Sequence, residues 1–432
     1  MNLGRRRNVH SGMCGTSVPH SFCPTPQQPG RSSDFLESRL AAFLRPLLWT
    51  LLVTTISVPR LSSGAEAPSS AHWSRGPSTD PGFFPLAVWV QNPANAARYR
   101  KAGINLYVGL WEGPTEAQLS ELKQAGMQVI CEQNQVALRH LENKTIVGWM
   151  HGDEPDNAQS LGARLGWGSP IPPEKILADY QRLRTADPTR PVMLNLGQGV
   201  AWDGYYGRGN RTGHPEDYPK YLKGCDIASF DIYPAVHDRK EIAGKLWYVG
   251  QGVERLIRWG GGNKIAWNCL ECTRISNPDR KPTPLEVRCE AWMSLIQGSR
   301  GLIYFVHQFK PTFREAALLD DPEMLGAVTA LNGQITRLAP VLNSPAIPDL
   351  ATAKADNASI PIACTGRRVN GSSWIFAVPL REGAGNVSFK LKSPEDARQA
   401  EVVDEDRKLQ VTQGAFQDHF DSWQVHLYRV SP

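Results

Sequence analysis

The stretch Thr145–Asn157, TIVGWMHGDEPDN, decides the fold predicted for this chain of 432 residues. Its first six residues form an apolar run without polar alternation, which is typical of a strand buried on both faces of a parallel sheet. The run ends at Asp153 and Glu154, and Pro155 then stops the strand. Parallel α/β folds place their chemistry at the carboxyl ends of strands, so adjacent carboxylates there indicate an acid/base centre.

Seven further apolar runs of strand length surround this one along the chain. They lie at 85–90, 104–111, 127–133, 191–196, 226–233, 264–270 and 301–307. Helical spacing separates them, for example at 115–126, 173–188, 285–300 and 322–339. Eight βα units within residues 83–345 predict a (β/α)8 TIM barrel. A doubly wound open sheet is the main alternative, but it requires a Gly-rich turn after the first strand, where the sequence reads VQNPANAA.

The chain changes character after Pro340, Pro345 and Pro348. Short runs of alternating apolar and polar residues follow one another without a helical pattern between them. We therefore predict a small all-β sandwich over residues 351–432, appended to the α/β barrel. Four large side chains on its alternating runs are expected to be buried: Trp374, Phe376, Trp423 and Tyr428.

Residues 1–65 have the order of a secretory signal. Arginines come first, the apolar run LLWTLLVTTISV (47–58) follows, and small residues precede a cleavage site near Ala65 or Ala67. We expect a secreted or periplasmic protein, with membrane attachment only if this leader is not cleaved. The leader holds seven Arg against two acids, a net of +5, which equals the net charge of the whole chain. The remainder is close to neutral, which argues against nucleic acid as a partner.

A second run, KIAWNCLECT (264–273), carries Glu271 near its carboxyl end. Two acids on two strand ends are what glycosidic bond cleavage requires. The chain resembles a retaining glycoside hydrolase of clan A in Gly148-Trp149 leading into Asp153-Glu154-Pro155, in Leu270-Glu271-Cys272, and in the sandwich after the barrel. The resemblance implies that Glu154 on strand four is the acid/base and that Glu271 on strand seven is the nucleophile. Glu271 has an alternative structural role as an ion-pair partner of Arg274.

One position departs from the pattern of the clan. An Asn usually precedes the acid/base there and hydrogen-bonds the sugar 2-hydroxyl, whereas this chain has Asp153. A second carboxylate beside Glu154 raises the local proton affinity, and it leaves open that the two acids exchange roles or that the site is inactive. By the same resemblance Tyr233, near the end of strand six, hydrogen-bonds the nucleophile.

Aromatic and amide side chains at other strand ends suit a carbohydrate cleft, because rings stack on sugars while amides and acids bind hydroxyls. The predicted substrate-binding residues are Asp153, Trp111, Asn195, Trp202, Tyr233 and His307. Further candidates are Trp89, Glu112, Gln133, Asn134, Gln198, Tyr205, Tyr206, Asp231 and Gln308.

The sequence therefore predicts a secreted glycoside hydrolase that cleaves a poly- or oligosaccharide by a retaining mechanism and without a cofactor. A catalytically silent carbohydrate-binding barrel is the alternative from another class. A metal-dependent hydrolase built on His151, Asp153 and His307 is weaker, because no HxH or HExxH pattern is present. The CxxC of Cys269 and Cys272 also lacks a second pair at zinc spacing, and we expect a core or disulfide role for it.

Overall fold

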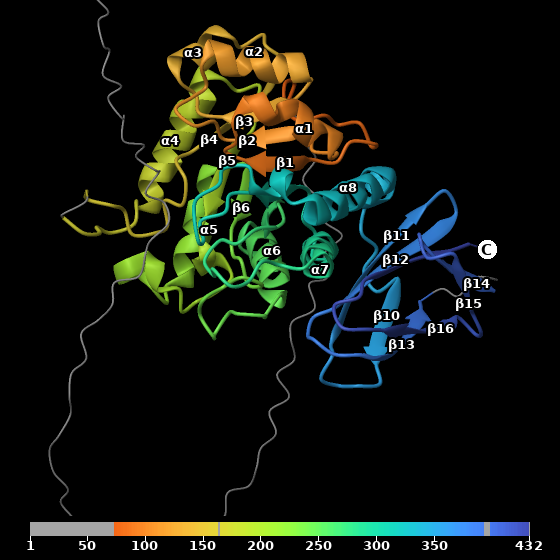
Figure 1. Cartoon of the computed structure of the whole chain (residues 1–432). Coiled ribbons are helices and arrows are strands. Elements are labelled where there is room, and N and C mark those ends of the chain that lie inside the picture. Colours follow the sequence, from red (N-terminus) through yellow and green to blue (C-terminus); the bar gives the residue numbers. More distant parts are fainter. Residues whose placement is uncertain (1–72, 163–164, 393–397, 432) are drawn as a thin grey trace, which may run out of the picture. The chain divides into compact units, whose positions relative to one another are not determined.

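The computed structural model describes residues 73–162, 165–392 and 398–431 (Figure 1). These residues belong to one compact unit, Glu66–Pro432. The predicted leader, residues 1–65, lies outside the described residues. Among the helices of the described part, none has both the length and the apolarity that crossing a membrane requires.

Residues 86–305 form a closed barrel of parallel strands, and each of the eight predicted runs holds a strand. The strands are β1 Leu86–Trp89, β2 Leu106–Val108, β3 Gln128–Cys131, β4 Ile146–Met150, β5 Val192–Leu196, β6 Ile227–Phe230, β7 Ile265–Ala266, β8 Asn268–Glu271 and β9 Leu302–Phe305. Their order in the sheet is β7-β6-β5-β4-β3-β2-β1-β9-β8. The seventh run is split into β7 and β8 at Trp267, where pairing passes from β6 on one side to β9 on the other. The barrel therefore closes on itself, and the predicted fold class is confirmed.

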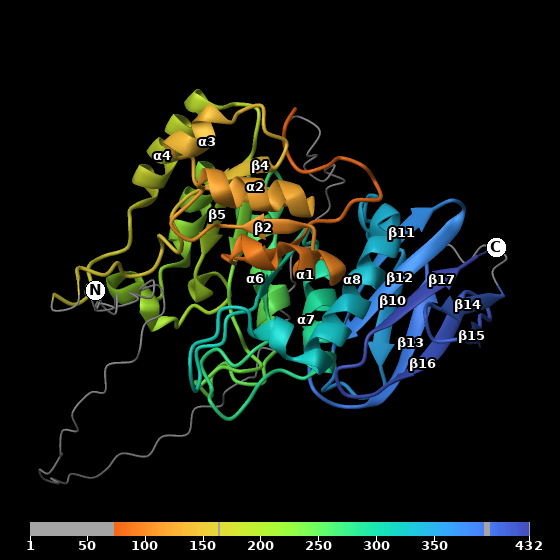
Figure 2. The ribbon, with the colours of Figure 1, turned by 45° about the horizontal axis from the view of Figure 1, so that its top comes forward.

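Helices connect the barrel strands and cover the outside of the sheet (Figure 2). They are α1 Ala96–Lys101, α2 Glu116–Ala125, α3 Gln135–Arg139, α4 Pro173–Ala186, α5 Tyr218–Tyr221, α6 Trp247–Trp259, α7 Pro284–Ile296 and α8 Pro322–Leu342. Local sequence sets their ends. Thr115 and Thr283 start α2 and α7 with capping boxes, and Gly126 ends α2 in the left-handed conformation.

The C-terminal residues form two antiparallel sheets, as predicted. The strands are β10 Ala351–Ala355, β11 Ile362–Val369, β12 Ser372–Pro379, β13 Gly385–Leu391, β14 Gln399–Val402, β15 Arg407–Gln410, β16 Ala415–Phe420 and β17 His426–Val430. One sheet has the order β10-β13-β16 and the other β11-β12-β17-β14-β15. Of the side chains expected to be buried, Phe376, Trp423 and Tyr428 are buried, while Trp374 is half-buried and packs at the edge of the core.

The sandwich packs on the barrel through α7 and α8. The ring centroids of Trp292 on α7 and Phe376 on β12 lie 5.2 Å apart. Phe376, Trp423 and Leu427 belong to the same apolar cluster as the barrel core, whereas Phe389 belongs to a second cluster inside the sandwich. The sandwich therefore contributes residues to the barrel core and also has a smaller apolar core of its own.

Candidate functional site

Three acids meet at the carboxyl ends of β4, β5 and β6. Asp153 and Glu154 follow β4, and Asp231 directly follows β6. Asn195 on β5 lies between the strands, and its Nδ2 donates to Asp153 Oδ1 at 2.9 Å and to Asp231 Oδ1 at 3.5 Å. The Ser229 hydroxyl in turn donates to Asn195 Oδ1 at 2.7 Å, which fixes the orientation of the amide. We call Asp153, Glu154 and Asp231 the carboxylate cluster.

Glu154 holds a strained position in this cluster. Its φ is 43°, in the left-handed region that non-glycine residues adopt rarely and mostly at functional sites. Its backbone N–H donates to the Asn195 carbonyl at 3.2 Å, and its Oε2 accepts from Asn157 Nδ2 at 2.8 Å. The Asn195 carbonyl therefore holds the backbone and Asn157 the side chain, and the residue is almost fully buried.

Burial and mutual repulsion keep protons on this cluster. Burial, followed by the charges of Asp231 and Asp153, raises the pKa of Glu154 well above its usual range, and Glu154 shares a proton with Asp231 by hydrogen bonding. The pKa of Asp231 rises to about 6 and that of Asp153 to about 7, in both cases chiefly through burial. None of the three acids forms a salt bridge within the described residues. Of the two acids with a given pKa, Asp231 therefore ionises before Asp153, and the surroundings of Glu154 favour its protonated form.

Asp156 anchors the segment that carries the cluster. Its side chain is fully buried, and its carboxylate accepts from the Gly197 N–H at 2.9 Å and from the Tyr218 hydroxyl at 3.0 Å. Gly197 is required here, because a Cβ at this position would lie 2.5 Å from Asn157 Oδ1. Asp156 thus ties the loop after β4 to the loops after β5 and before β6.

An aromatic group lies beside the carboxylate cluster, on the loops that follow β5 and β6. The ring centroid of Trp202 is 5.9 Å from that of Tyr205, 6.3 Å from that of Tyr206 and 5.9 Å from that of His237. Burial, and next the charges of Glu154 and Asp231, raise the pKa of Tyr205, so its hydroxyl lies close to the acids. Tyr206 is 41% exposed and Trp202 is half-buried, which leaves ring surface open to solvent.

Glu271, the predicted nucleophile, is not part of the carboxylate cluster. It ends β8 with no exposed surface, and its two oxygens accept from the backbone N–H groups of Ala235 at 2.6 Å and Val236 at 2.9 Å. The carboxyl group of Glu290 on α7 lies close enough to affect its pKa, and burial is the main cause that raises the pKa of Glu271 to about 8. Its partners are thus backbone amides and a second acid, and not Arg274, the ion-pair partner that the sequence suggested.

The other predicted contact residues divide between the cluster and its surroundings. Asn195 is hydrogen-bonded to Asp153 and Asp231. Tyr233 is buried beside Asp231, and its pKa is raised first by burial and then by the charge of Asp231. Tyr233 packs on Phe305, with ring centroids 5.1 Å apart. Trp111 is 44% exposed in the turn after β2, where its carbonyl accepts from Gln118 Nε2.

The residues of the predicted metal alternative have separate partners. His151 is buried and donates from Nε2 to the Gly224 carbonyl at 2.8 Å. His307 is bonded to the Gln91 amide at 3.1 Å, and burial lowers its pKa to about 4. Asp153 is bonded to Asn195 instead. Among the described residues, no group of three or more His, Cys, Asp or Glu is arranged to hold a metal ion, and the six cysteines at 131, 225, 269, 272, 289 and 364 are free.

Sequence reasoning missed Asp156, Asn157 and Glu290 as members of these networks, and it placed Asp231 only among the sugar contacts. A signal was present for Asp231, because it is an acid at the end of the apolar run DIASFDIY, as Glu154 is at the end of its own run. Asp156 and Asn157 stand in the quoted stretch, but nothing in the sequence distinguishes an anchoring acid from a reacting one.

No family model matches this chain, and no curated protein is similar to it in sequence. Solved structures that resemble it include an α-amylase from Anoxybacillus, at 10% identity and a TM-score of 0.49 over 82% of this chain and 98% of that one. A GH30 endoxylanase from Clostridium papyrosolvens is 10% identical, with a TM-score of 0.43 over 81% of this chain and 96% of that one. A GH27 β-L-arabinopyranosidase from Geobacillus stearothermophilus is 12% identical, with a TM-score of 0.45 over 81% of this chain and 97% of that one. These TM-scores are below 0.5, so the function has to be argued from the residues of the site.

Proposed function

We propose that this protein is a glycoside hydrolase in which Glu154 is the acid/base and Asp231 is the second carboxylate. The observation that carries the proposal is the carboxylate cluster itself: buried acids without a salt-bridge partner among the described residues, at the carboxyl end of a TIM barrel and beside partly exposed aromatic rings. Acids whose surroundings push their pKa values apart take the two roles that glycosidic cleavage needs.

The roles follow from where the protons reside. The raised pKa of Glu154 favours its protonated form, which suits donation to the leaving oxygen. Asp231, with a pKa of about 6, is largely ionised there and suits attack on the anomeric carbon, or stabilisation of its positive charge. Tyr233 is buried beside Asp231, as the resemblance implies for a tyrosine near the nucleophile, but its hydroxyl has no hydrogen-bond partner among the described residues.

A retaining mechanism requires two carboxyl groups about 5 to 5.5 Å apart. In the free protein a hydrogen bond between Glu154 and Asp231 contributes to the pKa of each, so the two carboxyl groups are neighbours. A sugar unit would have to enter between them and break that bond. Asp153 is held to the same Asn195 amide as Asp231, so it stays within reach as the group that takes up a displaced proton.

The test compares three variants on a substrate found by glycan screening. We expect Glu154→Gln and Asp231→Asn to abolish turnover with the fold intact, because the first removes the proton donor and the second the nucleophile. Glu271→Gln should retain turnover and lose stability, because an amide oxygen and an amide N–H replace two acceptors that face the Ala235 and Val236 N–H groups. Azide should rescue only an Asp231→Gly variant.

Three results would count against the proposal. If Glu271→Gln is inactive and azide restores activity to Glu271→Gly, then Glu271 is the nucleophile, as predicted from the sequence. An inverted anomer in NMR of the first product would exclude retention. Loss of activity in EDTA that zinc restores would favour the metal alternative.

A non-catalytic carbohydrate-binding protein is the second candidate. The hydrogen bond between Glu154 and Asp231 favours it, because a sugar unit has to break that bond before it can enter between the two acids. It predicts binding without turnover by the wild type, together with unchanged binding by Glu154→Gln.

We further propose that the protein acts outside the cytoplasm. The charged, apolar and small-residue order of residues 1–65 supports this proposal. Mass spectrometry of the protein isolated from its native host should find a mature N-terminus near Ala65 or Ala67, and a protein that retains residues 1–65 would contradict cleavage.

A further inference from the structure

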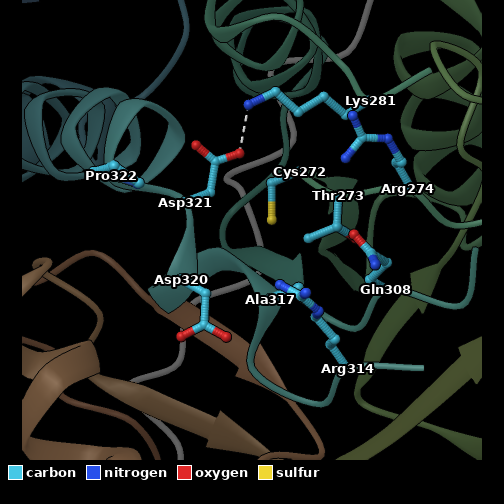
Figure 3. Close-up of a pocket in the computed structure, with 10 residues that line it drawn as sticks. All are labelled: Cys272, Thr273, Arg274, Lys281, Gln308, Arg314, Ala317, Asp320, Asp321 and Pro322. Atoms are coloured by element: carbon cyan, nitrogen blue, oxygen red, sulfur yellow. Dashed lines mark hydrogen bonds and ion pairs between the residues drawn. The ribbon is translucent and has the colours of Figure 1, made fainter. Parts of the chain in front are cut away.

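A basic pocket opens at the ends of β8 and β9, apart from the carboxylate cluster. It encloses about 220 Å³. Thr273 and Arg274 follow β8, Gln308 and Arg314 come from the loop after β9, and Lys281 and Asp321 close the other side (Figure 3). We call it the Arg274–Arg314 pocket.

The two acids that line this pocket, Asp320 and Asp321, already form ion pairs with basic side chains. Lys281 forms a salt bridge with Asp321, drawn as the dashed line in Figure 3, and Asp321 also caps α8 by accepting from the Met324 N–H at 3.1 Å. The remaining acid of the lining, Asp320, lies 4.0 Å from Arg98. These pairs leave Arg274 and Arg314 as the cations of the lining that no acid neutralises.

Arg274 and Arg314 are the feature that indicates a ligand. Within the described ranges, neither guanidinium group forms a salt bridge or a hydrogen bond with another protein group. Figure 3 shows both among the side chains that line the pocket, Arg274 from the segment after β8 and Arg314 from the loop after β9. A guanidinium group has five N–H donors in a planar fork that matches a carboxylate or a sulfate, and two such groups in one pocket strongly favour an anion over a neutral hydroxyl.

We propose that the Arg274–Arg314 pocket binds the carboxylate or sulfate group of an acidic sugar unit, so that the substrate is an anionic glycan. This inference rests on the proposed glycosidase function, because it assigns the substrate class of the same barrel mouth. Thr273 and Gln308 supply polar groups at the edge of the pocket, and they are suited to the hydroxyls of the same sugar unit.

A row of rings leads from the carboxylate cluster to this pocket. Tyr233, beside Asp231, packs on Phe305 at 5.1 Å, and Phe305 packs on His307 at 5.1 Å. His307 is stacked on Phe313 with ring centroids 6.1 Å apart, and Phe313 is 49% exposed. Gln308 of the pocket is the next residue after His307. Phe313, the exposed end of this row, directly precedes Arg314 in the chain, so a sugar unit stacked on the Phe313 ring lies next to the pocket.

The test measures binding by titration calorimetry with two pairs of probes. One pair is an oligogalacturonate of four units and the same oligosaccharide with its carboxyl groups reduced. The other is a sulfated galactan tetrasaccharide and its desulfated form. We expect wild type to bind one acidic probe at least roughly tenfold more tightly than its neutral counterpart, and Arg274→Gln or Arg314→Gln to remove most of that preference, because charge-assisted hydrogen bonds are lost. The preferred pair identifies the anion as carboxylate or sulfate.

Arg182→Gln is the matched control, because Arg182 is 63% exposed on α4, outside the pocket. It should bind as wild type does, and Arg274→Lys should retain part of the preference because it keeps the charge. Equal binding of acidic and neutral probes by wild type, or an unchanged preference in both glutamine variants, would overturn the inference. Since binding needs no turnover, these outcomes are independent of the Glu154 and Asp231 variants that test the proposed function.

Discussion

At the scale of single residues, the acids of the stretch DEPDN differ only in what they touch. Asp153 is half-buried and accepts a hydrogen bond from Asn195. Glu154 is hydrogen-bonded to Asp231. Asp156 accepts hydrogen bonds from the Gly197 amide and the Tyr218 hydroxyl. Burying several carboxyl groups together disfavours their ionised forms. The same arrangement that equips the site for proton transfer therefore destabilises the folded protein when these groups ionise.

We predict that Asp231→Asn stabilises the protein at neutral pH. The pKa of Asp231 is about 6 in the folded protein and about 3.9 in an unfolded chain. Its raised pKa contributes stability that is fully present below pH 4 and is lost as the pH rises to about 6, because the unfolded chain releases its proton first. Asparagine removes this loss, so the gain should be on the order of 2 kcal/mol at pH 7 and near zero at pH 4.

Urea unfolding of wild type and Asp231→Asn at both pH values measures this difference. Asp179→Asn is the control, because Asp179 is 39% exposed on α4 and should change stability little at either pH. An Asp231→Asn variant that is no more stable than wild type at pH 7 would show that this carboxylate is not strained by its surroundings.

At the scale of elements, the loop between β5 and β6 positions the aromatic group and depends on one buried arginine. Arg208 is 2% exposed, donates to Asp217 at 2.9 Å and to the His214 carbonyl at 2.8 Å, and lies over the Tyr218 ring at 4.8 Å. Gly207 lets the loop close, because a Cβ there would lie 2.3 Å from the Tyr205 hydroxyl. The rings beside the cluster are thus held by contacts remote from the chemistry.

We predict that Arg208→Gln lowers the free energy of unfolding by about 3 to 5 kcal/mol, as expected when one partner of a buried ion pair is removed. Arg211 binds the same Asp217 but is 37% exposed, so Arg211→Gln should cost about 1 kcal/mol or less. Denaturant unfolding of the two variants measures both values. If both variants lost the same free energy of unfolding, the burial of Arg208 would not account for its contribution to stability.

Most element positions follow from local sequence, and the one exception has a tertiary cause. Apolar runs predicted the barrel strands, and helical spacing predicted α2 and α7, which begin after the capping residues Thr115 and Thr283. The seventh run reads as one strand, but the structure divides it at Trp267. Its backbone N–H still donates to the Ala228 carbonyl on β6, while the next residue pairs with β9. Closing the barrel imposes this change of partner, and no local pattern encodes it.

At the scale of the whole molecule, the sandwich completes the barrel core. Trp292 on α7 is fully buried, and Phe376 from the sandwich covers it. Arg337 on α8 also pairs with Asp404 of the sandwich. This exposed pair contributes little stability, so the apolar contact is the main link between the two folds.

We predict that truncation at Pro345 yields insoluble protein, because it exposes the apolar face of α7 and α8. Phe376→Ala in the full chain should lower the free energy of unfolding by about 3 to 5 kcal/mol. Solubility of the truncated chain and thermal unfolding of the variant test these expectations. A soluble and fully active truncated barrel would show instead that the sandwich is dispensable.

The sequence by itself determined the eight-stranded barrel, the all-β module after it and the place of Glu154 at a strand end, because each depends on periodicity within a short window. The tertiary structure decided which acid faces Glu154. Asp231 and Glu271 both end apolar runs and look alike in the sequence. In the folded chain Asp231 lies against Glu154, whereas Glu271 is bound by the amides of Ala235 and Val236 and by Glu290. Side-chain direction at a barrel mouth depends on strand register and on the loops packed above it, which are properties of the closed fold and not of any one strand.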